Sequence, residues 1–260
     1  MYIHEPNFIY ANEDSTLYGV FLCSIETINT DSNDEESSPI LTTTTYKDTW
    51  DYHGSEKSAP LQFALTIAKK EGGYFDAYEL RAIKKWLCKG SRNWLQIDQD
   101  DISSAFYYCT ISNPRSVSVG MLNAGLEFQI TCDAQYPWSE LFGRNKTYLS
   151  TTTSSYNIYL DVDFDKYIVK PMISINPKAN GNISITNQTT NISIAFTNCI
   201  VNEIITLDCR TYKIKSSTGR VMLDNWNKNI LELKDGNNKL NLSGNFTMQI
   251  QYRLPIRIGG

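Results

Sequence analysis

Residues 246–252 read Phe246-Thr247-Met248-Gln249-Ile250-Gln251-Tyr252, an unbroken alternation of apolar and polar side chains. A period of two places every apolar side chain on one face of a β-strand. The same period recurs in nine further runs, whose apolar positions are 158/160/162/164, 173/175, 183/185, 192/194/196, 205/207/209, 212/214, 221/223, 231/233 and 240/242. Asn, Gly, Asp, Lys or Ser separates the runs. Ten short strands at this spacing predict an antiparallel β-sandwich over residues 156–260.

The first half of the chain mixes strands with one helix. Alternating or continuous apolar runs predict strands at 18–28, 61–68, 94–97, 106–111 and 126–132. Between the second and third of these runs, Asp76 and Glu79 have the spacing of a capping box. Apolar side chains then recur with helical spacing up to Leu87, and Gly90 is suited to ending a helix. We therefore predict a mainly β protein with one principal helix.

Residues 29–58 break every periodicity, and residues 31–38 are acidic and rich in serine. Because a long irregular segment is rarely passive in a compact domain, we interpret it as a projecting arm. Its aromatic side chains Tyr46, Trp50 and Tyr52 are candidate anchors on a partner. A solvated loop is the alternative for residues 31–38.

Composition narrows the class of protein. The chain is 41% hydrophobic with a net charge of −4, and it has no basic block of the kind that binds nucleic acid or anionic membranes. It also has no apolar run long enough to span a membrane and no visible signal peptide, so we expect a soluble protein made in a cytoplasm. Its six cysteines lack paired short spacing, which favours buried reduced thiols over disulfides or a zinc site.

Residues for catalysis are scarce. The chain has two histidines, His4 and His53, and it has none of the hydrolase, nucleotide-binding or metalloprotease motifs. The alternating acids at 161, 163 and 165 lack the glycine and glutamate of a calcium-binding loop, so we interpret them as the outer face of a strand. We expect no catalytic residue, no cofactor and no metal.

A change of pattern suggests where the chain divides. The stretch from Gly143 to Ser155 is polar and contains a run of Thr and Ser, as many linkers do. We predict an N-terminal domain over residues 1–140, a linker over 141–155 and the β-sandwich over 156–260.

Several short motifs occur in a familiar order. The helix ends at Trp86 and Leu87, and the predicted strands 94–97, 106–111 and 126–132 follow before Tyr136-Pro137-Trp138. Later, an aliphatic strand ends at Asp208. A strand-turn-strand with Gly236 and Asn237 follows and finishes at Ser243-Gly244. This order resembles the distal tail (Dit) protein family of siphophages over nearly the whole chain.

The resemblance implies a structural virion protein of the tail tip, assembled in the cytoplasm of a bacterial host. Its N-terminal domain would form a homohexameric ring, and its C-terminal domain would be a galectin-like sandwich. The ring would join the tail-tube protein to the tail-associated lysin or fibre protein, and in some phages it would carry a receptor-binding protein. Viral DNA would pass through an acidic lumen without specific binding, and no membrane would be contacted.

Two other functions remain open from the sequence. The sandwich could be a carbohydrate-binding or receptor-binding protein of the tail tip, with Tyr156, Tyr159, Tyr167 and Tyr212 stacking on sugars. A tail-tip hydrolase is the second alternative, and the scarcity of histidine argues against it.

Overall fold

The computed structural model describes residues 7–27, 39–43, 50–55, 60–99, 102–164 and 166–257. The chain divides into two compact units, with unit 1 reaching to Pro137 and unit 2 running from Trp138 to Arg257. Antiparallel strands dominate both units, and one α-helix occurs among the described residues. The fold class predicted from the sequence, mainly β with one principal helix, is confirmed.

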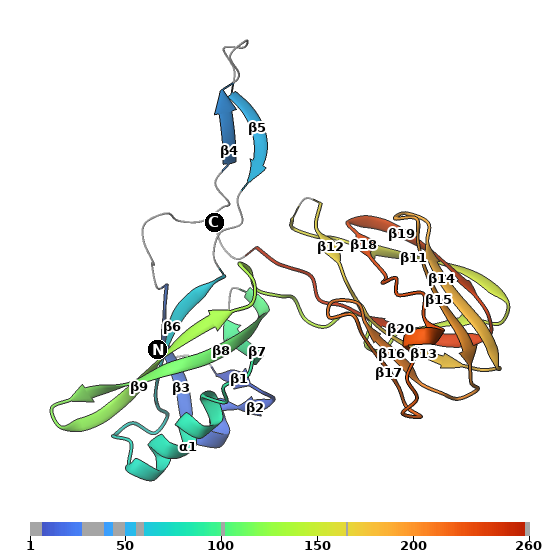
Figure 1. Ribbon diagram of the computed structural model, residues 1–260. Helices are drawn as coiled ribbons and strands as arrows, with labels where there is room; N and C mark the ends of the chain where they lie inside the picture. Colours follow the sequence, from blue (N-terminus) through green and yellow to red (C-terminus); the bar gives the residue numbers. More distant parts are fainter. Residues whose placement is uncertain are drawn as a thin grey trace. The chain divides into compact units, whose positions relative to one another are not determined.

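Unit 1 is built on a seven-stranded antiparallel sheet with the order β2-β1-β7-β8-β9-β6-β3 (Figure 1). Its strands are β1 (Phe8–Tyr10), β2 (Glu13–Asp14), β3 (Val20–Thr27), β6 (Gln62–Lys69), β7 (Asn93–Gln99), β8 (Ile102–Val119) and β9 (Leu122–Cys132). The sequence predicted five of them and missed β1 and β2. It also missed the outer halves of β8 and β9, where the side chains are mostly exposed.

The helix α1 (Ala77–Leu87) begins with the predicted capping box. The Asp76 side chain accepts hydrogen bonds from the backbone of Tyr78 and Glu79, and the Glu79 side chain accepts one from the Asp76 backbone. Ile83, Trp86 and Leu87 are buried against the core of unit 1. The apolar stripe of the helix therefore fixes its position on the sheet.

Two pieces of the predicted arm form an antiparallel hairpin, β4 (Pro39–Thr43) with β5 (Trp50–Ser55). Trp50 and Tyr52 lie on β5, but their side chains are outside the described part of the chain, as is the whole of Tyr46. The proposed anchoring by these three aromatic residues stays a prediction.

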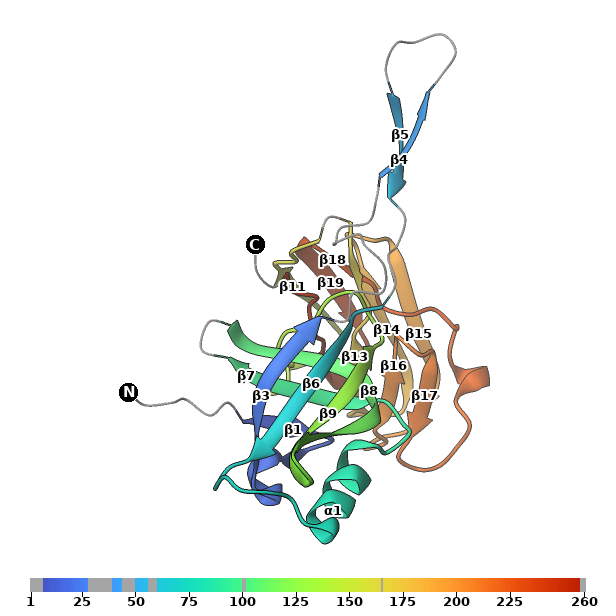
Figure 2. The same cartoon turned by 90° about the vertical axis from the view of Figure 1, so that its left-hand side faces the viewer.

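Unit 2 is a sandwich of two antiparallel sheets that share one hydrophobic core (Figure 2). The first has the order β10 (Thr147–Ser150), β20 (Phe246–Gln251), β13 (Met172–Pro177), β16 (Ile205–Asp208) and β17 (Lys213–Ser216). The second has the order β11 (Thr153–Leu160), β19 (Gly236–Ser243), β14 (Gly181–Asn187) and β15 (Ile192–Cys199). A short pair, β12 (Ile168–Val169) with β18 (Leu233–Lys234), completes it. Alternate side chains along the strands enter the core, as the period of two predicts.

Three predictions for this half are wrong. Asp161 and Asp163 do not line the outer face of a strand, because β11 ends at Leu160 and the two acids lie in the loop that follows it. The stretch 141–155 is not a linker, because β10 pairs with β20 over four residues and β11 begins at Thr153. The polar side chains that suggested a linker mostly face outward, while Tyr148 enters the core. Val221 and Leu223 are not on a strand either. They belong to a loop and to the short 3-10 helix η2 (Leu223–Asn225), and both are exposed.

Candidate interaction surfaces

The tryptophan of the helix motif has a structural role. The Trp86 ring is stacked on Tyr18, with centroids 4.2 Å apart and planes at 5°, and it also stacks on Phe8 at 5.4 Å. Its indole N–H donates to the backbone carbonyl of Tyr10 at 3.1 Å. Trp86 thereby joins α1 to β1 and to the 3-10 helix η1 (Ser15–Tyr18), and its neighbour Leu87 is fully buried.

Asp208 also acts within the fold, at the end of β16 as predicted. Its carboxylate accepts hydrogen bonds from the backbone N–H of Arg210 at 2.9 Å and from the Thr211 hydroxyl at 2.7 Å. A carboxylate that accepts from the residues just after it holds a tight turn, here the turn into β17. The residue is therefore part of the scaffold of unit 2.

The glycine-asparagine motif of Gly236 and Asn237 is followed directly by a buried amide, that of Asn238. Gly236 opens β19 with φ +77°, a backbone conformation that favours glycine. Asn237 is exposed, whereas Asn238 is fully buried together with Asn187. Asn238 accepts from the backbone N–H of Lys234 at 2.9 Å and donates to the Lys234 carbonyl at 2.7 Å. The Asn187 amide donates to Asn238 at 3.1 Å and so ties β14 to β19.

We expect Asn238→Ala to lower the free energy of unfolding of unit 2 by about 2 kcal/mol, because the Lys234 backbone and the Asn187 amide each lose hydrogen bonds to the buried Asn238 side chain. Asn237→Ala is the matched control and should change it by less than about 0.5 kcal/mol, since its side chain is exposed. Urea unfolding of the two variants side by side measures the difference. Equal effects would show that Asn238 is not the structural asparagine.

Unit 1 carries an exposed apolar surface at the end of its long hairpin, which extends past the neighbouring strands (Figure 1). We define the hairpin tip surface as Val117, Val119, Met121 and Leu122, with exposed fractions of 39%, 61%, 101% and 49%. Val119 pairs with Leu122 in the last register position before the turn. The backbone N–H of Phe75 donates to the Asn123 carbonyl at 2.9 Å, so the half-exposed Tyr74 lies beside this hairpin.

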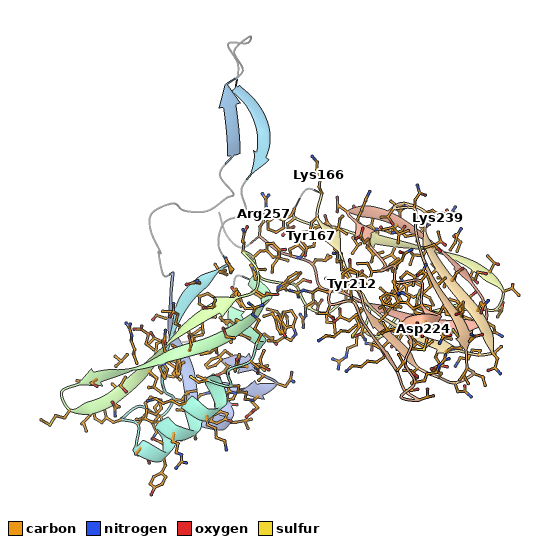
Figure 3. The ribbon with its side chains drawn as sticks, viewed as in Figure 1. Lys166, Tyr167, Tyr212, Asp224, Lys239 and Arg257 are labelled. Atoms are coloured by element: carbon orange, nitrogen blue, oxygen red, sulfur yellow. The ribbon has the colours of Figure 1, made fainter. Side chains whose placement is uncertain are left out.

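Unit 2 carries a second exposed apolar surface on two loops. We define the loop surface as Ile200, Val201, Ile204, Val221 and Leu223, each at least 43% exposed. Asp224, which Figure 3 labels, lies on η2 directly after Leu223. The first three residues precede β16 and the last two follow β17, so the two loops lie at the same end of one β-hairpin.

An ion pair between the buried Glu203 and the partly exposed Arg220 holds the two loops together. Glu203 has an exposed fraction of 1%, and its carboxylate accepts from Arg220 Nε at 2.7 Å and from Nη2 at 2.8 Å. The Ser216 hydroxyl also donates to this carboxylate, and Arg220 donates to the Asn198 carbonyl at 2.9 Å. The hydrogen bonds from Arg220 lower the pKa of Glu203 to about 2. The ion pair therefore holds in place the two loops that carry the exposed apolar side chains.

The four tyrosines considered for sugar stacking do not share one element. Tyr156 is half-buried, stacks edge-on against Tyr148 and hydrogen-bonds through its hydroxyl to the backbone of Leu149. Tyr159 is exposed on β11, Tyr167 packs against the core, and Tyr212 is in the turn before β17.

Among the described residues, no three His, Cys, Asp or Glu side chains are grouped closely enough to hold a metal ion. No helix in that part of the chain is both long and apolar enough to cross a bilayer.

Comparison with known proteins identifies the family. A profile described as the phage tail protein N-terminal domain matches residues 4–134, and one described as the phage tail C-terminal domain matches residues 136–252. The chain belongs to the phage tail proteins. The family that the sequence suggested is thus confirmed, and the two profiles meet close to the division between the two units.

Solved structures share the fold of this phage tail protein along nearly its whole length. The Dit protein of phage SPP1, described as a paradigm of hub adsorption apparatus in phages that infect Gram-positive bacteria, aligns with a TM-score of 0.65 at 12% identity. The alignment covers 96% of this chain and 99% of that one. A chain of the phage p2 baseplate in its activated conformation with strontium aligns with a TM-score of 0.59 at 9% identity, covering 96% and 98%. A search of curated proteins finds no match.

Three features of the two units were not predicted from the sequence. The first is Asn238, which directly follows Asn237, the asparagine of the predicted motif. The second is Glu203, an isolated acid within the apolar run from Ile200 to Ile205. An acid in such a run is a signal for a buried, paired charge. The third feature, the hairpin tip surface, had its own signal, because Ser116-Val117-Ser118-Val119 alternates as a strand does.

Proposed function

We propose that this phage tail protein is a non-enzymatic hub subunit at the distal end of the tail. The proposal rests on the likeness to the SPP1 hub protein. The alignment of the two structures extends over both units and covers nearly all of each chain. A hub differs from a single binding module because it needs one unit for its ring and another for its attachments. The two-unit architecture supports that division of labour.

Unit 1 forms a homohexameric ring in this proposal, and the hairpin tip surface is where one copy meets the next. A closed ring requires a heterologous contact, in which one patch of each subunit meets a different patch of its neighbour. The tip fits that need because Met121 is wholly exposed and Val119 is 61% exposed, an unfavourable state for a monomer in water. Tyr46, Trp50 and Tyr52 supply a second contact from the arm.

We expect Val119→Glu to shift the assembly toward monomers by at least tenfold in dissociation constant, because a carboxylate would be buried in an apolar contact without a partner. Mass photometry over a concentration series measures the shift.

Ser118→Glu is the matched control. It adds the same charge one position away, on the opposite face of the same exposed strand. The control should assemble as the unmodified chain does. If both variants or neither lost the oligomer, the contact would not lie on this face of the hairpin.

The remaining partners follow from the hub role. One face of the ring meets the tail-tube protein and the other meets the tail-associated lysin or fibre protein, and viral DNA slides through a lumen lined by subunits of net charge −4. Unit 2, galectin-like in form, faces outward. Its loop surface binds a receptor-binding protein. The contact surface of that partner has an acidic rim, because the exposed Lys213 and Lys215 of unit 2 lie on the adjoining strand β17.

Location in the virion tests this function. Gold-labelled antibody against the purified chain should bind at the distal end of the tail in electron micrographs of intact phage. Label along the length of the tail would indicate a tube protein instead, and label on the fibres alone would indicate a receptor-binding protein.

A further inference from the structure

Two cysteines face each other across neighbouring strands at the base of the long hairpin of unit 1. Cys109 on β8 is in direct register with Cys132 on β9. Their side chains are 0% and 1% exposed, so both thiol groups are buried in the core of unit 1. Both are free thiols in the structure.

The backbone defines what kind of position this pair occupies. The N–H of Asp133 donates to the Tyr108 carbonyl at 3.0 Å, while the N–H of Cys132 points away from β8 and donates to the Leu61 carbonyl. Cys109 and Cys132 are therefore a non-hydrogen-bonded pair of the ladder. In such pairs the Cα atoms are typically about 4.5 Å apart, which is inside the range of roughly 4.4–6.8 Å that a disulfide spans.

We propose that Cys109 and Cys132 are a latent cross-strand disulfide, formed when the folded protein meets a small-molecule disulfide such as oxidised glutathione. One protein thiolate attacks a glutathione sulfur, forms a mixed disulfide and releases one glutathione thiolate. The second protein thiolate then attacks the protein-bound sulfur and releases the other. The two cysteines lose two protons and two electrons in total, and oxidised glutathione is reduced to two molecules of glutathione.

Burial sets the rate of the first step. The neighbouring thiol and the loss of solvent both raise the pKa of Cys109, so its attacking thiolate is scarce at neutral pH. The reaction is therefore slow at pH 7 and faster as the pH rises. The geometry permits the bond once a brief opening of the hairpin admits the oxidant.

The bond would close the chain around residues 110–131, which contain the hairpin tip surface. A closure of that length should raise the melting temperature of unit 1 by roughly 5 °C. The benefit to a virion, which leaves a reducing cytosol for an oxidising medium, rests on the proposed function. The thiol chemistry itself does not.

Peptide mapping of the full chain tests the inference directly. The reduced protein is incubated with oxidised glutathione at pH 8.5, unfolded in acid, alkylated and digested with trypsin without reduction. Cleavage after Arg92, Arg115 and Arg144 places Cys109 and Cys132 in separate peptides with one cysteine each. We expect these two peptides to appear joined, and dithiothreitol should separate them.

The exposed Cys23 is the internal control for the oxidant. If Cys23 formed a mixed disulfide with glutathione while Cys109 and Cys132 were both alkylated, the inference would be wrong. It would also be wrong if either cysteine linked to a different residue. A matched variant, Cys199→Ala, should leave the Cys109–Cys132 link unchanged, because Cys199 belongs to unit 2. An unlinked pair in a chain that still forms a hexamer would reject the disulfide and leave the hub intact.

Discussion

We expect Arg220→Ala to lower the free energy of unfolding of unit 2 by about 3 kcal/mol at pH 7, because it leaves the Glu203 carboxylate buried without its cation. The size follows from the pKa of Glu203, which Arg220 and its neighbours lower from the ordinary 4.5 to about 2. Oxidation of Met248, a buried methionine of β20, measures the unfolding of unit 2 along a urea series.

The same pair predicts how stability depends on pH. A carboxyl group whose pKa is lower in the folded state stabilises the fold above its unfolded pKa, and that contribution is lost as the pH falls toward the folded value. The unmodified chain should therefore lose this stability between about pH 5 and pH 2. Arg220→Ala should lose much less over that range, since its carboxylate is no longer held ionised.

Two further variants show whether the lower free energy of unfolding comes from the broken ion pair or from a general loss of stability. Replacing both partners, Glu203→Met with Arg220→Met, should restore most of the stability because neither charge remains buried. Lys239→Ala removes an exposed cation of the same unit and should change the free energy of unfolding by less than about 0.5 kcal/mol. A loss below about 1 kcal/mol for Arg220→Ala would mean that water reaches Glu203 in solution.

Trp86→Ala has the largest expected effect in unit 1, a loss of about 3–5 kcal/mol in the free energy of unfolding. The variant leaves a cavity beneath α1, removes the ring stacked on Tyr18 and deprives the Tyr10 carbonyl of its donor. Trp86→Phe keeps a ring without the N–H and should cost about 1–2 kcal/mol. Hydrogen exchange of peptides from β6 and β9 measures both losses.

Tyr78→Ala is the matched control on the same helix, because the Tyr78 side chain is 85% exposed. It should change the free energy of unfolding by less than about 0.5 kcal/mol. If Trp86→Ala and Tyr78→Ala had similar effects, the docking of α1 would not depend on the stacked indole.

The sequence predicted the fold where burial and periodicity coincide. The strands of unit 2 and the capped helix α1 bury one face, so their apolar spacing indicated both their type and their inner side. The strand β10 was mistaken for linker because only Tyr148 marks its buried face among hydroxyl side chains. Edge strands that bury one large side chain give little periodic signal.

The interaction surfaces were harder to predict for a different reason. Alternation shows that Val117 and Val119 share a face, but it does not show whether that face meets a core or solvent. Glu203 and Arg220 are 17 positions apart, and only the folded hairpin β16–β17 brings them together. The positions of such groups depend on tertiary structure, which a local pattern does not contain.

We propose that this phage tail protein closes into a ring of six. Native mass spectrometry of the purified full chain tests it most directly, with electron microscopy of the same sample to show the shape. We predict a dominant species of six chains that forms a ring with a central opening. A chain that stayed monomeric at tens of micromolar, or that formed open filaments, would rule out the closed ring.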